Sequence, residues 1–249
     1  MNPLATLYTH WDAWVYTASI VLVFPLFGRF LYGRLTSAEV DARAPKKTET
    51  YMAIIAMEWL FCGVIFLLMN RHSITLTDLG ERLGILWRTI IASVALLAAL
   101  GVLMIQNIHQ LQKTPSAELE KGLGGGRKFY PYSRTELWIF PLVAITTGTC
   151  EELIFRGWLV NFLGGVTHSI WIGVVLGSVA FGIGHAHQGS KGILTTGLLG
   201  LIFGAIFVIT SSLICAQVLH VAVNLVNGLV GAYAVSLLKP STQSTFSAT

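Results

Sequence analysis

The sequence has 249 residues, of which 54% are hydrophobic and 11% are charged, and its formal net charge is +4. A mean hydropathy of +0.69 excludes a soluble globule with one core and indicates a polytopic membrane protein. The basic residues lie in short segments beside apolar stretches, where topology and anionic lipid account for them. We therefore expect membrane lipid, and no nucleic acid, as a partner.

Seven apolar stretches follow one another along the chain, each close to the length of about 20 residues that crosses a bilayer as a helix. These stretches cover residues 11–33, 51–70, 84–106, 137–164, 169–186, 192–210 and 213–238. The fourth is longer than one span needs and is either one long tilted helix or a helix followed by a short broken one. We predict an all-α fold, a polytopic membrane bundle of about seven to eight transmembrane helices.

The start of the chain does not resemble a cleavable signal peptide, because no Lys or Arg precedes Arg29 and Asp12 lies at the head of the first stretch. Basic residues gather after the first and the third stretches, and such residues are enriched in cytoplasmic loops. Seven spans with the N-terminus outside satisfy this rule. We expect a multi-pass integral protein, of the cytoplasmic (inner) membrane if the source is bacterial.

We expect a single integral-membrane domain over residues 1–249, because no internal repeat is visible. Residues 1–135 would form amino-terminal helices and cytoplasmic loops that shape the bundle. Residues 136–238 would form the catalytic helices, and residues 239–249 a polar, disordered tail.

Two connecting segments carry no candidate catalytic or ligand-binding residues. Residues 73–83 carry spaced apolar side chains and form either a short interfacial helix or a partly ordered loop. The Gly-rich run 122–126 is a flexible linker, because a phosphate-binding loop would continue with Gly-Lys-Ser/Thr.

Glu151 and Glu152 are the only carboxylate side chains after Glu136, and an apolar tract surrounds them. An ionisable group at membrane depth costs about 2.5–3.5 kcal/mol, so the pair indicates a functional site. Glu152 and Arg156 are four positions apart and share a helix face, where they can form an ion pair. We expect this pair to keep Glu152 ionised and to leave Glu151 free to exchange protons with water. The alternative is a buried ion pair that only ties helices together.

Two further polar patterns follow. Phe181 and His185 are four positions apart, near small residues that leave room for a substrate backbone, and His185 could share a water with Glu151. His187 lies nearer the helix end, where a solvated boundary position is expected. The alternative for His185 is an ordinary core histidine.

His220 and Asn224 are also four positions apart, and Asn227 continues the same helix face. Imidazole and amide groups are good donors toward a developing oxyanion. The alternative is hydrogen bonding between helices, which polar side chains in membranes often form.

Together, Glu-Glu-x-x-x-Arg, Phe-x-x-x-His and His-x-x-x-Asn, in this order, resemble the three motifs of the CAAX protease and bacteriocin-processing family (CPBP, or Abi), which are intramembrane proteases. The resemblance covers about residues 137–237, and Asp-Leu-Gly at 78–80 resembles the preceding family region. It implies a type II CAAX prenyl endopeptidase-like hydrolase in which Glu151 and His185 activate water. It further implies that His220 and Asn224 stabilise the oxyanion. The motif residues Glu152, Arg156 and Phe181 would support the site or the substrate.

The sequence leaves the role of a metal open between a glutamate-type and a metalloprotease mechanism. Zn²⁺ could be bound by Glu151, His185 and His220, with an open position for water. A Glu in an apolar site can also act as a base without a metal. We favour the reading without a cofactor.

Other classes of protein fit less well. A site-2-type metalloprotease needs His-Glu-x-x-His, which is absent around His185. All aspartates precede the active half, which disfavours a presenilin-type enzyme, and no Gly-x-Ser-x-Gly surrounds Ser178, which disfavours a rhomboid-type enzyme. A non-catalytic peptide-binding immunity protein and an ion or proton relay transporter remain as alternatives. For the protease, the substrate is a membrane-associated peptide or protein, either prenylated or a peptide precursor.

Overall fold

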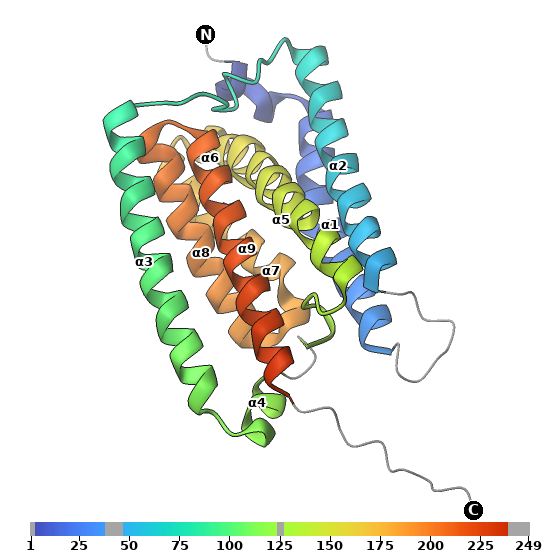
Figure 1. Ribbon diagram of the computed structural model, residues 1–249. Helices are drawn as coiled ribbons and strands as arrows, with labels where there is room; N and C mark the ends of the chain where they lie inside the picture. Colours follow the sequence, from blue (N-terminus) through green and yellow to red (C-terminus); the bar gives the residue numbers. More distant parts are fainter. Residues whose placement is uncertain (1–2, 38–46, 124–126, 239–249) are drawn as a thin grey trace, which may run out of the picture.

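The computed structural model describes residues 3–37, 47–123 and 127–238. Within these ranges the regular structure is entirely helical, which confirms the predicted all-α bundle (Figure 1). Most of the predicted glycine linker and the predicted polar tail lie outside the described residues.

The helices follow the predicted apolar stretches closely. In chain order they are η1 (Pro3–Thr9), α1 (Trp11–Ser37), α2 (Lys47–His72), α3 (Leu86–Lys113), α4 (Ser116–Leu123), α5 (Arg134–Glu152), η3 (Leu153–Val160), α6 (Asn161–Thr167), α7 (Ile170–Gly184), η4 (Ala186–Gln188), α8 (Gly189–Thr210) and α9 (Leu213–Leu237). Among the described residues, 6 helical segments are long and apolar enough to cross a membrane. The fifth stretch forms α7, which is apolar but has only 15 residues.

The fourth stretch is one continuous helical segment of 34 residues, Arg134–Thr167. It begins with a capping box, in which Ser133 and Glu136 exchange side-chain and backbone hydrogen bonds. Its middle part, η3, is π-helical. Such a segment shifts the backbone hydrogen bonds from i→i+4 to i→i+5. The Asn161 side chain supplies a replacement donor, since its Nδ2 lies 2.8 Å from the Gly157 carbonyl oxygen.

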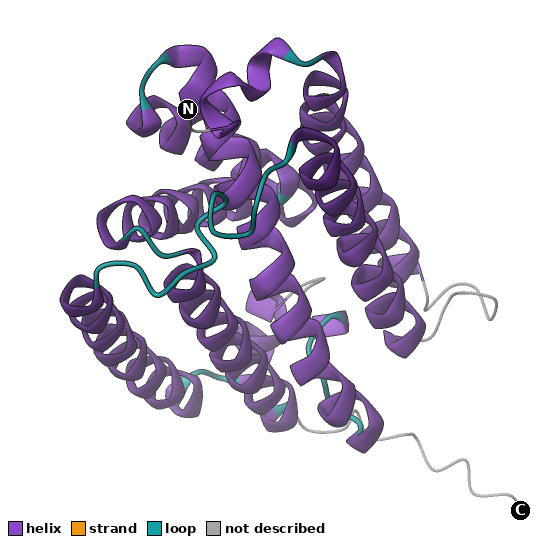
Figure 2. Ribbon diagram, turned by 90° about the horizontal axis from the view of Figure 1, so that it is seen from above, coloured by secondary structure: helices purple, strands orange, loops and turns teal. Residues whose placement is uncertain are grey.

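The long segment of α5 and η3 lies at the centre of the bundle. It crosses the molecule obliquely between α2 and α9, and α3 stands at the edge (Figures 1 and 2). Every residue of η3 is buried, and several belong to the largest apolar core. In contrast α3, which the structure describes throughout, has no buried residue. The centre of the molecule therefore carries both the core and the acid pair.

Small residues bring α5 and α9 into close contact. A Cβ added at Gly148 would lie 2.7 Å from the backbone nitrogen of Val221, and one added at Gly228 would lie 2.0 Å from Cε1 of Phe140. Glycine is enriched where membrane helices approach closely, because the backbones can then touch. This approach holds the acid pair at the end of α5 beside the polar face of α9.

The segment between α2 and α3 is a loop of turns, so the interfacial helix was the wrong alternative. Leu79 is fully buried, and the loop is bound to the turn between α8 and α9. The Leu213 nitrogen donates to the Gly80 carbonyl at 2.7 Å, and the Ile85 nitrogen donates to the Thr210 carbonyl at 2.8 Å. These bonds fix the loop against the start of α9.

Candidate active site

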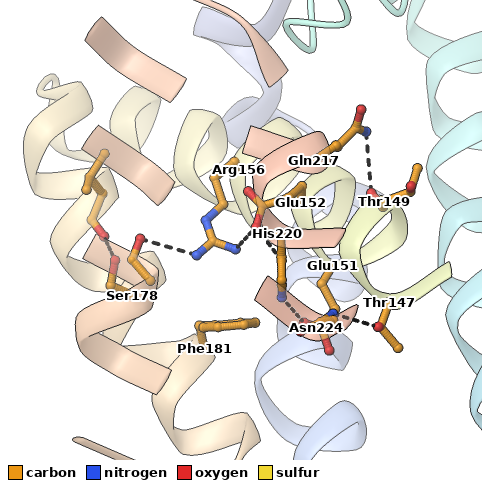
Figure 3. A network of polar contacts seen from close by, with 12 residues as sticks. Thr147, Thr149, Glu151, Glu152, Arg156, Ser178, Phe181, Gln217, His220 and Asn224 are labelled. Carbon is orange, nitrogen blue, oxygen red and sulfur yellow. Dashed lines mark hydrogen bonds and ion pairs between the residues drawn. The ribbon is translucent and has the colours of Figure 1, made fainter. Parts of the chain in front are cut away.

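The last residue of α5, Glu152, is the best-anchored acid of the site, and its exposed fraction is 0%. Its Oε1 accepts hydrogen bonds from Nη1 of Arg156 at 2.7 Å and from Nδ1 of His220 at 2.8 Å (Figure 3). The predicted ion pair between Glu152 and Arg156 is thus confirmed. The bond to His220 adds a second charge-assisted donor that the sequence did not indicate. Oε2 of Glu152 is buried without a hydrogen-bond partner.

The guanidinium of Arg156 is fixed on several sides. Nη2 donates to the carbonyl oxygen of Gly200 in α8 at 3.2 Å. The group also lies over the rings of Phe181 and Phe203, at 4.6 and 5.6 Å from their centroids. A buried guanidinium that is fixed by hydrogen bonds and ring contacts holds the carboxylate paired with it in one position. Arg156 therefore orients Glu152.

The imidazole of His220 bridges the two acids. Its Nδ1 is bonded to Glu152, and its Nε2 lies 3.7 Å from Oε2 of Glu151. The ring stacks on Phe203 with 4.8 Å between centroids and meets Phe181 edge-on at 6.1 Å. If Nδ1 donates its proton to the Glu152 carboxylate, Nε2 of the neutral ring is an acceptor, and only the imidazolium donates from both nitrogens.

Glu151 and Asn224 complete the part of the site between α5 and α9. Figure 3 shows their side chains converging with that of His220. Glu151 is buried, whereas Asn224 is half-buried. Nδ2 of Asn224 donates to Oγ1 of Thr147 at 3.0 Å. An amide group has two N–H donors, so one donor of Asn224 is left for a ligand.

His185 lies just after the end of α7. Its Nδ1 is 2.9 Å from the carbonyl oxygen of Phe181. A carbonyl only accepts, so Nδ1 carries the proton and Nε2 of the neutral ring presents a lone pair. The Phe181 ring lies 4.7 Å from the His185 ring and also contacts the His220 ring. Among the described residues no hydrogen bond joins His185 to Glu151, so the shared water stays a prediction.

His187, which we placed at a solvated boundary, instead packs against the first helix. Its ring lies 5.2 Å from that of Tyr32. Its Nδ1 is buried without a hydrogen-bond partner.

The sequence analysis overlooked Glu58, in the middle of α2. Its exposed fraction is 1%, and its Oε2 is buried without a partner. Glu58 lies close to Glu151 and Cys150. One signal could have revealed it, because Glu58 is the single charged residue of the apolar stretch 51–70. The site therefore holds three buried acids rather than two.

A second missed contact fixes α9 at the level of the acid pair. Nε2 of Gln217 donates to Oε1 of Glu81 at 2.7 Å and lies 3.4 Å from the carbonyl oxygen of Thr149. Gln217 stands one turn before His220 on α9. The loop between α2 and α3, through Glu81, thus fixes the helix that carries His220.

The donor set does not present a preassembled metal site. In the described ranges, no group of three or more His, Cys, Asp or Glu side chains is arranged to hold a metal ion. The proposed zinc ligands Glu151, His185 and His220 are therefore not gathered as a three-ligand cluster. We derive no step through a metal, and the metal requirement stays a prediction.

The comparison with known families identifies the part of the chain that carries the three motifs. Residues 133–226 match the family described as type II CAAX prenyl endopeptidase Rce1-like. No match was found among curated proteins or among solved structures. The region that runs from the start of α5 into α9 is thus similar to the Rce1-like type II CAAX prenyl endopeptidases, which confirms the resemblance drawn from its motifs.

Proposed function

We propose that the protein is an intramembrane endopeptidase that hydrolyses a peptide bond of a membrane-associated substrate. The observation that carries this proposal is the convergence of Glu151, Glu152 and His220 in the centre of an apolar bundle. A purely structural ion pair would need only Glu152 and Arg156. A second buried acid lies 3.7 Å from Nε2 of the same histidine, which is longer than a hydrogen bond, and burying it costs free energy; this favours a catalytic reason for it.

In the proposed reaction, Glu151 takes a proton from the attacking water while Nε2 of His185 accepts a hydrogen bond from its other O–H. The water oxygen forms a bond to the carbonyl carbon, and negative charge develops on the carbonyl oxygen. His220, as imidazolium, and the free N–H of Asn224 donate to this oxyanion. The C–N bond then breaks, and Glu151 returns its proton to the leaving nitrogen.

Glu152 has a supporting role in this scheme. Its carboxylate binds Nδ1 of His220 and so fixes the orientation of the imidazole, much as a buried acid orients a catalytic histidine in other hydrolases. In this scheme His220 is charged, because only the imidazolium donates from both ring nitrogens. Arg156 balances the charge of Glu152.

The family description supports a choice of substrates to test. Because the matched family is one of prenyl endopeptidases, a peptide with a prenylated cysteine near its C-terminus is the first substrate to test. An unprenylated membrane-bound precursor peptide is the second.

The decisive variant is Glu151→Gln, because it keeps the shape of the side chain and removes its basicity. We expect purified wild-type protein in detergent to cleave a peptide from such a set, and Glu151→Gln to abolish turnover with unchanged thermal unfolding. Glu49→Gln, which changes an exposed acid of α2, should cleave normally. Cleavage by Glu151→Gln near the wild-type rate would refute the proposed role of Glu151. Tight peptide binding without cleavage by the wild type would indicate a binding protein instead.

A further inference from the structure

A cavity of about 360 Å³ lies between α3, α4 and α9. In Figure 1, α4 connects to the end of α3 and lies near the end of α9. The lining begins on α9 at Asn227, one turn beyond the proposed oxyanion donor Asn224. Ligand pockets in proteins measure about 300–1,000 Å³, so this cavity is large enough for a short peptide segment.

Neutral amide groups face the cavity from both long helices. Asn107 and Gln110 line it from α3, and Asn227 lines it from α9. All three side chains are exposed, and within the described part of the chain none of them is hydrogen-bonded to another protein group, so a ligand can reach them. Each amide offers donors and an acceptor, which is what the main chain of a bound peptide requires.

The charge of the lining selects among ligands. Among the described residues that line the cavity, Glu118 of α4 is the one charged residue, and none is Lys or Arg. An anionic lipid headgroup would need basic residues, so the lining disfavours it. An ammonium or guanidinium group would instead find a carboxylate partner in Glu118.

One wall of the cavity is held in place independently of any ligand. The Tyr130 ring packs against Gly231, where an added Cβ would lie 2.1 Å from Cδ1 of the ring. The Tyr130 carbonyl accepts a hydrogen bond from Nζ of Lys47 at 2.8 Å. Such preorganisation lowers the entropic cost of binding a ligand.

We propose that this cavity is a substrate subsite that binds the peptide main chain through Asn107, Gln110 and Asn227 and a basic side chain through Glu118. This inference rests on the proposed peptidase function. A helix rises about 1.5 Å per residue, which places Asn227 about 4.5 Å and Ala234 about 15 Å beyond Asn224 along the axis. An extended peptide advances about 3.3 Å per residue, so the α9 wall of the cavity covers about the first to the fifth peptide residue from the scissile bond. We expect the basic residue of the peptide in this range.

The test measures peptide binding to the Glu151→Gln variant, so that it does not depend on cleavage. The probes are fluorescent alanine-based decapeptides with one farnesylated cysteine, in which one Lys is moved through the other positions and compared with Gln at the same position. Binding to protein in nanodiscs is followed by anisotropy. At one or two positions we expect Lys to bind about tenfold more tightly than Gln, which corresponds to about 1.4 kcal/mol.

Substitutions on α4 then assign the effect. Adding Glu118→Gln should remove the Lys preference. Adding Glu120→Gln, which changes an exposed acid of the same helix that pairs with Arg127, should keep it. Adding Asn227→Ala should weaken the binding of the Lys and the Gln peptides alike.

The subsite proposal would be overturned if the Lys preference survived Glu118→Gln, or if Lys bound more tightly than Gln at no position. It would also be overturned if no peptide bound at all, or if binding depended only on the anionic lipid content of the nanodiscs. Failure of the peptidase proposal is seen separately, as wild-type protein that leaves every probe intact. In that case a Lys preference that depends on Glu118 would still establish the peptide-binding cavity.

Discussion

The imidazole of His220 has one nitrogen left for a substrate, because the other is bonded to Glu152. Removing this ring therefore removes a proposed oxyanion donor and also takes from Glu152 one of the two hydrogen-bond partners that it has among the described residues. Asn224→Ala is the cleaner test, since its side chain is half-buried and lies outside the ion pair.

We expect Asn224→Ala and His220→Ala each to lower kcat by roughly 10²–10³, the scale observed when one oxyanion donor is lost. Peptide binding should persist in both, and His220→Ala should also unfold at a lower temperature. Ser236→Ala, which changes an exposed residue of the same helix, is the control and should cleave normally. If the variants lost peptide binding but still cleaved the peptide that was bound, His220 and Asn224 would be substrate-binding residues rather than oxyanion donors.

The buried acid of α2 gives a prediction on stability. Glu58 has an unpartnered oxygen and lies near a second acid, and an unsatisfied buried polar group costs about 1–3 kcal/mol. We expect Glu58→Met to raise the unfolding temperature in detergent and to slow cleavage, because stability and activity are often opposed at functional sites. Glu49→Gln on the same helix should change neither. A lower unfolding temperature for Glu58→Met would mean that Glu58 stabilises the fold.

At the scale of the elements, the contact of α5 with α9 decides whether the site assembles, since one helix carries both acids and the other carries His220 and Asn224. Gly148 lies at this contact, and its missing side chain lets the two backbones approach.

We expect Gly148→Ala to force α9 away from α5, to destabilise the protein by about 1–3 kcal/mol as other overpacked cores do, and to reduce cleavage strongly. Gly63→Ala is the matched control, because a Cβ at Gly63 of α2 would meet nothing within 4 Å. Thermal unfolding and kcat of both variants check the prediction. Equal effects of the two substitutions would show that the change acts through helix propensity rather than through the contact.

The helices were predictable from the sequence because spanning length and hydropathy act locally, and each apolar stretch forms a helix. The bond between Glu152 and Arg156 was predictable for the same reason, since both residues lie on one helix. The π-helical part η3 has no compositional signature. Gln217 was missed because its partner, Glu81, comes from a distant part of the sequence and meets it only in the folded bundle. Glu58 had a local signal, as the single charged residue of its apolar stretch, but its proximity to Glu151 arises only in the folded bundle.

At the scale of the whole molecule, the amino-terminal half contributes more than the expected framework. Its second helix brings Glu58 close to Glu151, and Thr17 of the first helix accepts a hydrogen bond from Trp158 of η3 at 3.1 Å. The family match begins only at residue 133. The amino-terminal half therefore lies outside the matched region and yet contacts the site.

Whether the protein needs a metal ion for activity can be tested on the whole protein. A zinc enzyme loses activity when a chelator removes the ion and regains it when the metal is restored. We expect protein that has been chelated extensively, with its metal content measured by elemental analysis, to continue to cleave and to be inhibited by excess Zn²⁺. Activity that follows one bound ion per chain would overturn this expectation and would make Glu151 and the histidines ligands.

The shortness of α7 has a consequence for the surrounding lipid. Its 15 residues span only about 22 Å at 1.5 Å per residue, against a hydrocarbon core of about 30 Å. The side chains of Trp171, Val175 and Val179 are exposed along one side of it, and we expect this side to face the acyl chains. A bilayer thins beside a helix that is too short for it, and His185 lies at the end of this helix. We therefore expect the membrane itself to bring water to His185, and thicker bilayers to slow the proposed hydrolysis.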